Sequence, residues 1–224
     1  MRVPLFIEFS GKNVLVIGGG QVGTKRAKKF AEAGANVVVI SKEFTKELEE
    51  LQSIGKVKLV KMDLTNPSDI SNLHNWIIWA DLVIYTIPDD SLAFLIKSLC
   101  TTYRKLFNDA TSVERTDVVI PMEGKVDGIR IAVTTEGKSS VLARVIVNEL
   151  SRYIDNNLEL KNLAEAWFKV KEYLKSNIKD RRLRMVIYYE LSNDEKFNEI
   201  AKKSPDEAVN YAYSKIKELL LKYR

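Results

Sequence analysis

Residues 13–23, NVLVIGGGQVG, constrain the fold of this chain more than any other stretch of its sequence. They begin with a short apolar, largely β-branched run, continue with Gly18, Gly20 and Gly23, and lead into a segment with helical periodicity. A strand, a G-x-G-x-x-G turn and a helix in this order are the context in which such glycines bind a dinucleotide. Glycines also end strands for purely structural reasons, but a second apolar strand predicted at 36–40 favours the binding interpretation.

Each glycine of the turn has its own expected role. Gly18 allows the chain to turn sharply, Gly20 lets the backbone approach a pyrophosphate, and Gly23 lets the helix pack close to the strand. The unpaired N–H groups and the positive dipole end of the helix then face the phosphates. The predicted phosphate-binding residues are therefore Gly18, Gly19, Gly20, Gln21, Val22 and Gly23.

The first half of the chain alternates between strand-like and helix-like segments, which indicates an α/β protein with a parallel, doubly wound sheet. Helices are expected after the glycine turn, after Thr45, around Leu73 and over residues 91–103. An apolar segment at 3–9 is expected to cover the sheet edge. The ligand crevice should lie at the carboxyl ends of the strands. The predicted strands are residues 13–17, 37–40, 57–60, 82–87 and 106–108.

The pattern changes after residue 110. Short strands predicted at 118–121 and 129–134, separated by a long turn, indicate an antiparallel hairpin. A helix should follow from Ser139 or Ser140, and the chain is helical from residue 158 onward.

Composition narrows the class of protein. The 224 residues are 46% apolar, and the single cysteine, Cys100, excludes an internal disulfide framework and favours the cytoplasm. No run of about eighteen apolar residues and no leader pattern is present, so we expect neither a membrane span nor processing. The net charge of +5 is too small and too dispersed to demand nucleic acid. It favours an anionic ligand, although a salt-bridged surface rich in Lys and Glu explains it equally well.

Several segments together resemble one family. They are VPLFIEFSGKNVLVIGGGQVGTKRA at 3–27, the Pro88-Asp89-Asp90 turn, DVVIP at 117–121 and TTEGKSSVLAR at 134–144. In this order they resemble precorrin-2 dehydrogenase, the family that forms the dehydrogenase and ferrochelatase part of siroheme synthase. The resemblance covers residues 3 to about 150.

The resemblance implies a Rossmann-type domain at 1–112, a small α+β dimerisation module at 113–153 and a helical C-terminal region at 154–224. It implies a homodimer that oxidises precorrin-2 to sirohydrochlorin with NAD in siroheme biosynthesis, and ferrochelatase activity in some members. Because no methyltransferase segment follows, we expect a short, dehydrogenase-type form. The alternative from another class is a regulatory subunit that senses NAD without turnover.

A tetrapyrrole with many carboxylates is the substrate that the resemblance implies, and cationic side chains around a cleft would hold it. Lys138 and Arg144 lie in the family-like GKSSVLAR segment and are the first candidates. Ser139 could bind substrate or iron, or could simply cap a helix. For Arg115, Arg130 and the basic cluster at 179–184, a solvated surface is the expectation.

The proton-accepting group is harder to assign. The family typically has an aspartate three residues after the asparagine that matches Asn108, and this sequence has Thr111 there. Asp109 points to the same side as Thr111 in an extended segment, so it is the substitute candidate, as general base or iron ligand. A solvated turn aspartate is the alternative. No metal ligands are assigned; His74 is expected at the surface and Cys100 in a buried helix.

The ribose-binding position also departs from the fingerprint. An acid is expected near the end of the second strand, but Ile40 is followed by Ser41 and Lys42. Ser41 can bond the ribose, whereas Lys42 would tolerate a 2′-phosphate, so the residues leave NADP open while the resemblance favours NAD. Pro88, in the turn after the fourth strand, is also expected to contact the cofactor.

Overall fold

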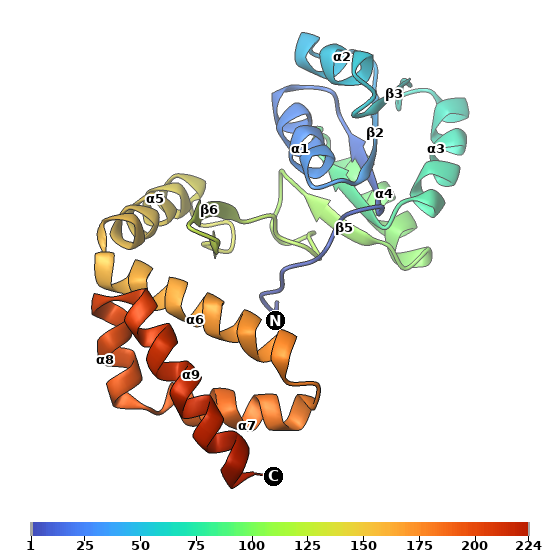
Figure 1. Cartoon of the computed structure of the whole chain (residues 1–224). Coiled ribbons are helices and arrows are strands. Elements are labelled where there is room, and N and C mark those ends of the chain that lie inside the picture. The colour runs from blue at the N-terminus through green and yellow to red at the C-terminus, as the bar shows by residue number, and fades with distance from the viewer. Residues whose placement is uncertain (1, 224) are drawn as a thin grey trace. The chain divides into compact units, whose positions relative to one another are not determined.

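The computed structural model describes residues 2–223, which form two compact units. The first unit contains the residues up to 121 together with 134–139, and the second contains 122–133 and the residues from 140 onward (Figure 1). The three-part division expected from the sequence instead separates the hairpin region from the C-terminal helices at residue 153. That division stays a prediction.

The first unit is a five-stranded parallel sheet in the order β3-β2-β1-β4-β5, which confirms the predicted α/β architecture. The order reverses between β1 and β4, where doubly wound sheets bind their ligands. The strands are β1 Asn13–Ile17, β2 Asn36–Ser41, β3 Lys58–Lys61, β4 Leu82–Tyr85 and β5 Leu106–Asp109, and the helices are α1 Gln21–Glu32, α2 Lys46–Ser53, α3 Pro67–Trp79 and α4 Asp90–Thr102. The fourth strand thus ends two residues earlier than expected.

Helices cover both faces of this sheet, which is why the interiors of its central strands β1, β2 and β4 are apolar (Figure 1). Val14 and Val16 pack in one core with residues of α1 and α2, whereas Leu15 and Ile17 pack in the other with residues of α3 and α4. Cys100 of α4 is fully buried in that second core, as expected. The alternating strand residues therefore serve two separate layers.

The start of α3 corrects one sequence interpretation. The helix expected around Leu73 is 13 residues long and begins further upstream than that residue suggests, because residues 66–69 cap and start it. The Asn66 side chain accepts from the Ser68 N–H, and Pro67 occupies the first turn, where its missing N–H costs nothing. These residue types favour turns and helix starts alike, so the local signal could not distinguish them.

The antiparallel hairpin is confirmed with its second strand where it was predicted, but its first strand lies further along the chain. Residues 118–121 form no strand; instead β6 Met122–Val126 pairs antiparallel with β7 Ile129–Val133 around a two-residue turn. Asp127 and Gly128 have φ values of +45° and +82°, the left-handed conformation that Asp-Gly turns favour. Val118 and Ile120 pack against the core of the first unit, so the apolar run serves that core and not a strand.

The second unit consists of this hairpin and five helices: α5 Ser140–Asn156, α6 Leu158–Asn177, α7 Arg181–Ser192, α8 Glu195–Lys203 and α9 Pro205–Lys222. Ala143 and Val147 of α5 are buried, and a Cβ on Gly124 of β6 would lie 3.0 Å from Val147, so hairpin and helix pack closely. The last four helices enclose a core of their own. The Ser204 hydroxyl caps α9 by accepting from the Glu207 N–H.

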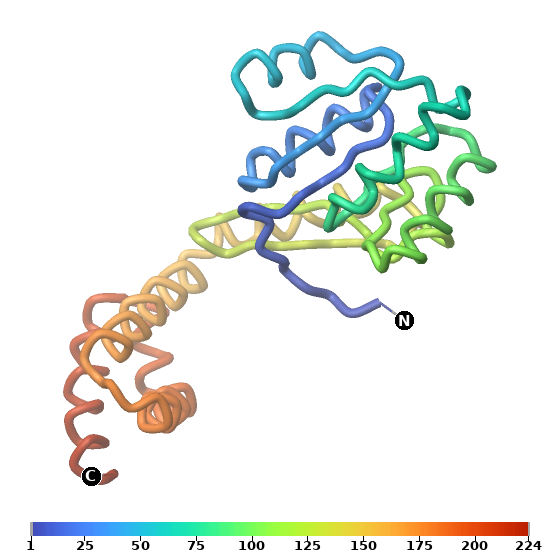
Figure 2. The backbone as a smooth tube through the Cα atoms, turned by 90° about the vertical axis from the view of Figure 1, so that its right-hand side faces the viewer, coloured from blue at the N-terminus to red at the C-terminus, as the bar shows by residue number. Residues whose placement is uncertain are grey.

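The N-terminal segment does not cover the sheet edge as expected. Val3, Leu5 and Phe6 are all more than two-thirds exposed, and the segment runs as an extended trace (Figure 2). Phe9, at the end of the segment, packs edge-on against Phe30 of α1 with ring centroids 4.7 Å apart. Among the described residues, no helix is both long and apolar enough to span a bilayer.

Candidate functional site

A cavity of about 750 Å³ opens at the carboxyl ends of the parallel strands, the position that the fold reserves for a ligand. Five of the predicted cofactor residues line it: Gly18, Gly19, Gly20, Ser41 and Pro88. Sequence reasoning did not assign the others, which are Lys42, Glu43, Phe44, Thr45, Met62, Leu64, Thr65, Thr86, Ile87, Asp89 and Leu92. The remaining predicted residues, Gln21, Val22 and Gly23, form the first turn of α1.

The three glycines of the turn have different surroundings. A Cβ on Gly23 would lie 1.9 Å from the Gly18 carbonyl oxygen, so only glycine lets α1 approach the turn this closely. Gly18 has a φ of +113°, and a Cβ there would lie 2.3 Å from the Thr86 hydroxyl oxygen. Around Gly20 no atom lies within 4 Å of a Cβ position. Gly18 and Gly23 therefore shape the turn, whereas Gly20 leaves open space beside it.

The N-terminus of α1 is the element most suited to phosphate. Thr45, Asn66 and Asp89 cap α2, α3 and α4 with their side chains, but the cap residue of α1 is Gly20, which makes no side-chain hydrogen bond. Within the described chain, the first turn of α1 also contains no acidic residue. Its free N–H groups and positive dipole end would thus be satisfied by a pyrophosphate. The residues present fit a dinucleotide.

The wall between β2 and β3 can hold the adenosine half of such a ligand. Phe44, Met62 and Leu64 supply apolar surface, and Ser41 ends β2 with a hydroxyl at the ribose position. The Lys42 ammonium lies 2.8 Å from the Asp63 carboxylate, in the loop after β3. The spacing of Lys42 and Asp63 in the sequence does not predict this pair, because it depends on how β2 and β3 align.

On the other side of the turn, Thr86 joins two strand ends. Its hydroxyl donates to the Ile17 carbonyl oxygen at 3.0 Å, and its N–H donates to the same oxygen at 2.9 Å. The end of β4 is therefore held against the glycine turn. A threonine directly after an apolar strand is a weak signal, and only the sheet order gives it meaning.

Asp109, the predicted general base or iron ligand, ends β5 with its side chain fully buried. One carboxylate oxygen accepts from the Thr111 N–H and hydroxyl at 2.8 and 2.6 Å, and the other accepts from Arg115 at 2.7 Å. Burial alone would raise the pKa of this carboxyl, but the bonds from Thr111 and Arg115 outweigh it and lower the pKa. Asp109 is therefore a buried anion, and each of its two oxygens accepts at least one hydrogen bond.

Arg115 departs from the solvated position expected for it. Its side chain is only 15% exposed, pairs with Asp109 and with Asp90 at 2.9 Å, and stacks on the Phe94 ring at 5.2 Å. The buried carboxylate and the ring hold the guanidinium in place. Because both partners lie on other segments, the sequence alone did not reveal this cluster.

The three predicted substrate residues are divided between the two units. Lys138 has an exposed side chain in the first unit, Ser139 precedes the start of α5, and Arg144 is exposed on α5 in the second unit. Neither Lys138 nor Arg144 forms an ion pair with another described residue. The substrate role of these residues stays a prediction.

His74 and Cys100 lie in packed parts of the first unit. His74 is half-buried beside Tyr103, with ring centroids 6.2 Å apart, and burial raises the pKa of the Cys100 thiol to about 12. Within residues 2–223, no three His, Cys, Asp or Glu side chains are gathered as metal ligands.

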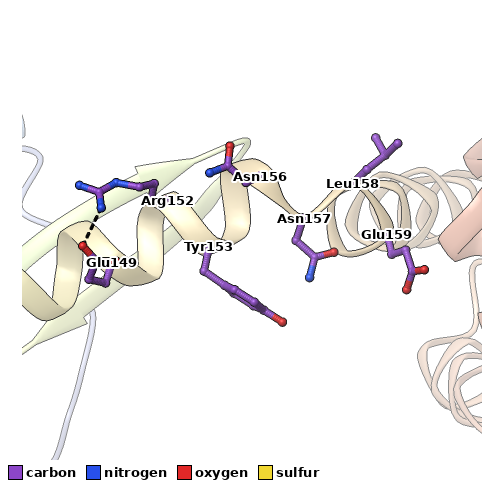
Figure 3. Close-up of a pocket in the computed structure, with 7 residues that line it drawn as sticks. All are labelled: Glu149, Arg152, Tyr153, Asn156, Asn157, Leu158 and Glu159. Atoms are coloured by element: carbon purple, nitrogen blue, oxygen red, sulfur yellow. Dashed lines mark hydrogen bonds and ion pairs between the residues drawn. The ribbon is translucent and has the colours of Figure 1, made fainter.

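A second depression lies in the other unit, where α5 passes into α6 (Figure 3). Its lining mixes both charge signs: Arg152 pairs with Glu149 at 2.7 Å, and Glu159 adds another acid. Tyr153 and Leu158 add apolar surface. This mixture selects no single class of ligand.

Comparisons with known proteins agree with a dinucleotide as the ligand of the cavity beside the glycine turn. Residues 5–122 match the family described as "Putative NAD(P)-binding". A Methanocaldococcus jannaschii protein described as "Putative precorrin-2 dehydrogenase" is 31% identical over 90% of this chain and 95% of its own. The precorrin-2 dehydrogenase of Methanosarcina barkeri is 28% identical over 98% of this chain and 95% of its own.

A solved structure supports the fold. SirC, a precorrin-2 dehydrogenase, aligns with a TM-score of 0.66 at 17% identity, covering 97% of this chain and all of that one. The class of the protein is therefore an NAD(P)-binding α/β protein with a helical second unit. The chain belongs to the precorrin-2 dehydrogenase family.

The open space around Gly20 yields a first prediction. Gly20→Val should fold like the wild type, because its backbone is extended and no atom lies near a Cβ. Its NAD affinity, measured by isothermal titration calorimetry, should fall by about tenfold or more, since the side chain enters the space for the pyrophosphate. Gly23→Ala is the contrast, because its Cβ would collide with the backbone and lower the melting temperature. A folded Gly20→Val variant with unchanged NAD affinity would contradict this role.

The Asp109 cluster yields a second prediction, on stability and pH. Asp109→Asn should lower the free energy of unfolding at pH 7 by about 1–3 kcal/mol, because a buried hydrogen-bonded charge is lost. The folded pKa of Asp109 lies below the ordinary value of about 3.9. Its stabilisation is therefore complete above about pH 4 and is lost as the pH falls through the folded pKa. Urea unfolding at pH 7, 5, 4 and 3 should show the two proteins converging in acid; a constant difference would refute the assignment.

Proposed function

We propose that this chain catalyses the NAD-dependent dehydrogenation of precorrin-2 to sirohydrochlorin. The observation that carries the proposal is the uncapped N-terminus of α1 facing the cavity, in a chain that spans 95% of two relatives named for this activity. When bound, NAD supplies the hydride acceptor.

The chain's own residues would hold the cofactor by three kinds of contact. The backbone of Gly18 to Gly20 and the first turn of α1 bind the pyrophosphate, and the Ser41 hydroxyl bonds the ribose. The apolar wall formed by Phe44, Met62 and Leu64 takes the adenine. Pro88, which follows β4, lies on the other side of the cavity and would border the nicotinamide half.

The substrate half of the proposal rests on charge. Precorrin-2 carries many carboxylates, and Lys138 and Arg144 are exposed cations that could each hold one, with Ser139 as a neutral donor between them.

For Asp109, the geometry favours positioning over proton transfer. A base must lie within hydrogen-bond reach of the proton it takes, whereas the Asp109 side chain is fully buried and its two oxygens are held by Thr111 and Arg115. We propose that Asp109 orients Arg115 and the loop that follows β5. If it also acts as a base, its replacement will remove the acidic limb of the pH-rate profile; a positioning role changes the rate at all pH values alike.

We further propose that the protein is a homodimer formed through α5. Leu142, Val145 and Tyr153 lie at intervals of three and eight residues on one face of this helix, and each is at least half exposed. Ala143 and Val147, on the opposite face, pack on the hairpin. An exposed apolar stripe of this kind is typical of a protein interface, and the twofold symmetry of homodimers would pair it with itself.

The activity is tested directly under anaerobic conditions. Precorrin-2 and NAD incubated with the protein should yield the sirohydrochlorin spectrum and one NADH for each molecule formed. Omission of NAD is the control. NAD binding without any spectral change would overturn the proposal and favour a nucleotide-sensing subunit.

The dimer has its own test. Val145→Glu places a charge in the middle of the stripe and should produce monomers in sedimentation equilibrium, because an unpaired charge is not tolerated inside an apolar interface. Ile54→Glu, the same kind of change at an apolar residue that is 67% exposed on the first unit, should leave the dimer intact. A dimeric Val145→Glu protein would show that another surface forms the contact.

A further inference from the structure

The ribose end of the cavity contains a charge pair that the cofactor fingerprint does not explain. β2 ends at Ser41 with no acid, and Lys42 follows it. By itself, a Ser-Lys sequence at this position would allow the 2′-phosphate of NADP to bind. The Lys42 ammonium, however, lies 2.8 Å from an oxygen of Asp63 and 3.5 Å from the Thr65 hydroxyl.

The sheet itself brings the two residues together. Ser41 pairs with Lys61 in the register of β2 and β3, and the Met62 N–H donates to the Ser41 carbonyl oxygen at 3.0 Å. This bond extends the pairing by one residue past the end of β3, so Asp63 comes to lie beside Lys42. The pair is a consequence of strand register and not of flexible side chains meeting by chance.

Asp63 is also fixed from its other side. The oxygen that contacts Lys42 accepts from the Thr65 N–H at 2.8 Å and from its hydroxyl at 2.6 Å. The Asp63 N–H in turn donates to the Asp69 carboxylate at 2.8 Å, which anchors the loop to α3. Hydrogen bonds from Lys42 and Thr65 lower the pKa of Asp63 to about 2, so it is an anion at neutral pH.

This arrangement treats the two nicotinamide cofactors differently. Lys42 and Thr65 line the cavity, and a 2′-phosphate at the end of β2 would have to draw Lys42 away from Asp63 and then lie near that carboxylate. The phosphate would gain little, because the positive charge is already neutralised and a negative charge stands next to it. A free 2′-hydroxyl carries no charge and meets no such penalty.

We propose that Asp63 sets the preference for NAD over NADP by holding Lys42. It supplies, from the loop after β3, the negative charge that this fold ordinarily places at the end of β2. Asp63 acts through Lys42 and is a specificity-determining residue without a place in the reaction. The inference rests on the proposed use of a nicotinamide cofactor and makes no assumption about the tetrapyrrole.

Binding constants test it without turnover. Dissociation constants for NAD and NADP should be measured by isothermal titration calorimetry on the wild type, Asp63→Asn and the double variant Asp63→Asn with Lys42→Met. The wild type should prefer NAD. Asp63→Asn keeps an oxygen that can accept from Thr65. This substitution should lower the dissociation constant of NADP by about tenfold and change that of NAD by less than about threefold, because only the 2′-phosphate gains an ion pair with the freed ammonium.

The double variant and the salt dependence complete the test. Removal of Lys42 should cancel the gain for NADP, and the gain should shrink between 50 mM and 500 mM NaCl, since both groups are about half exposed. Glu50→Gln removes one charge from an exposed position on α2 outside the cavity and should leave both constants unchanged. An Asp63→Asn protein with the wild-type ratio of NADP to NAD affinity would overturn the proposal, as would a gain that survives the loss of Lys42.

The outcome separates this inference from the proposed function. If the three proteins bind as expected and none oxidises precorrin-2, the specificity role of Asp63 stands and the dehydrogenase proposal falls. If the wild type binds neither NAD nor NADP, both fall together.

Discussion

The close approach of Gly23 to the Gly18 carbonyl oxygen is the contact on which the rest of the first unit depends. A Cβ at position 23 would lie 1.9 Å from that oxygen, so the packing exists only because the residue has none. The approach directs the N-terminus of α1 toward the end of β1, where the strand order reverses. Free N–H groups, the positive end of the helix dipole and the crevice thereby coincide, and each of them favours a phosphate.

Much of this unit could be predicted from the sequence because its signals are local. The apolar runs of β1 and β2, the glycine turn and the alternation with helices all lie within short windows. The first strand of the hairpin was misplaced for the opposite reason. Val118 and Ile120 look like a strand, but their apolar side chains belong to the core of the first unit, and the backbone around Val118 bonds to the end of β5. A pattern of apolar residues does not tell which core they join.

The same distinction runs through the site. Gly18, Gly20, Ser41 and Pro88 lie within or beside recognisable motifs, and all four line the cavity. Other interactions of the site join residues far apart in the sequence, such as Lys42 with Asp63 and Thr86 with Ile17. They follow from strand register and strand order, which a single sequence does not contain. The residues at the ribose position therefore left NADP open, whereas in the folded chain Asp63 already neutralises the lysine that would bind a 2′-phosphate.

Pairing also determines which cations remain for an anionic substrate. Lys42 and Arg115 lie near the carboxyl ends of the strands, yet one is held by Asp63 and the other by Asp109 and Asp90. The net charge of +5 is therefore not concentrated where the cofactor would bind. Backbone dipoles suffice for a pyrophosphate, because it needs several N–H donors more than a full charge. A substrate with many separate carboxylates needs point charges instead, and exposed cations outside the cofactor cavity are the ones that can supply them.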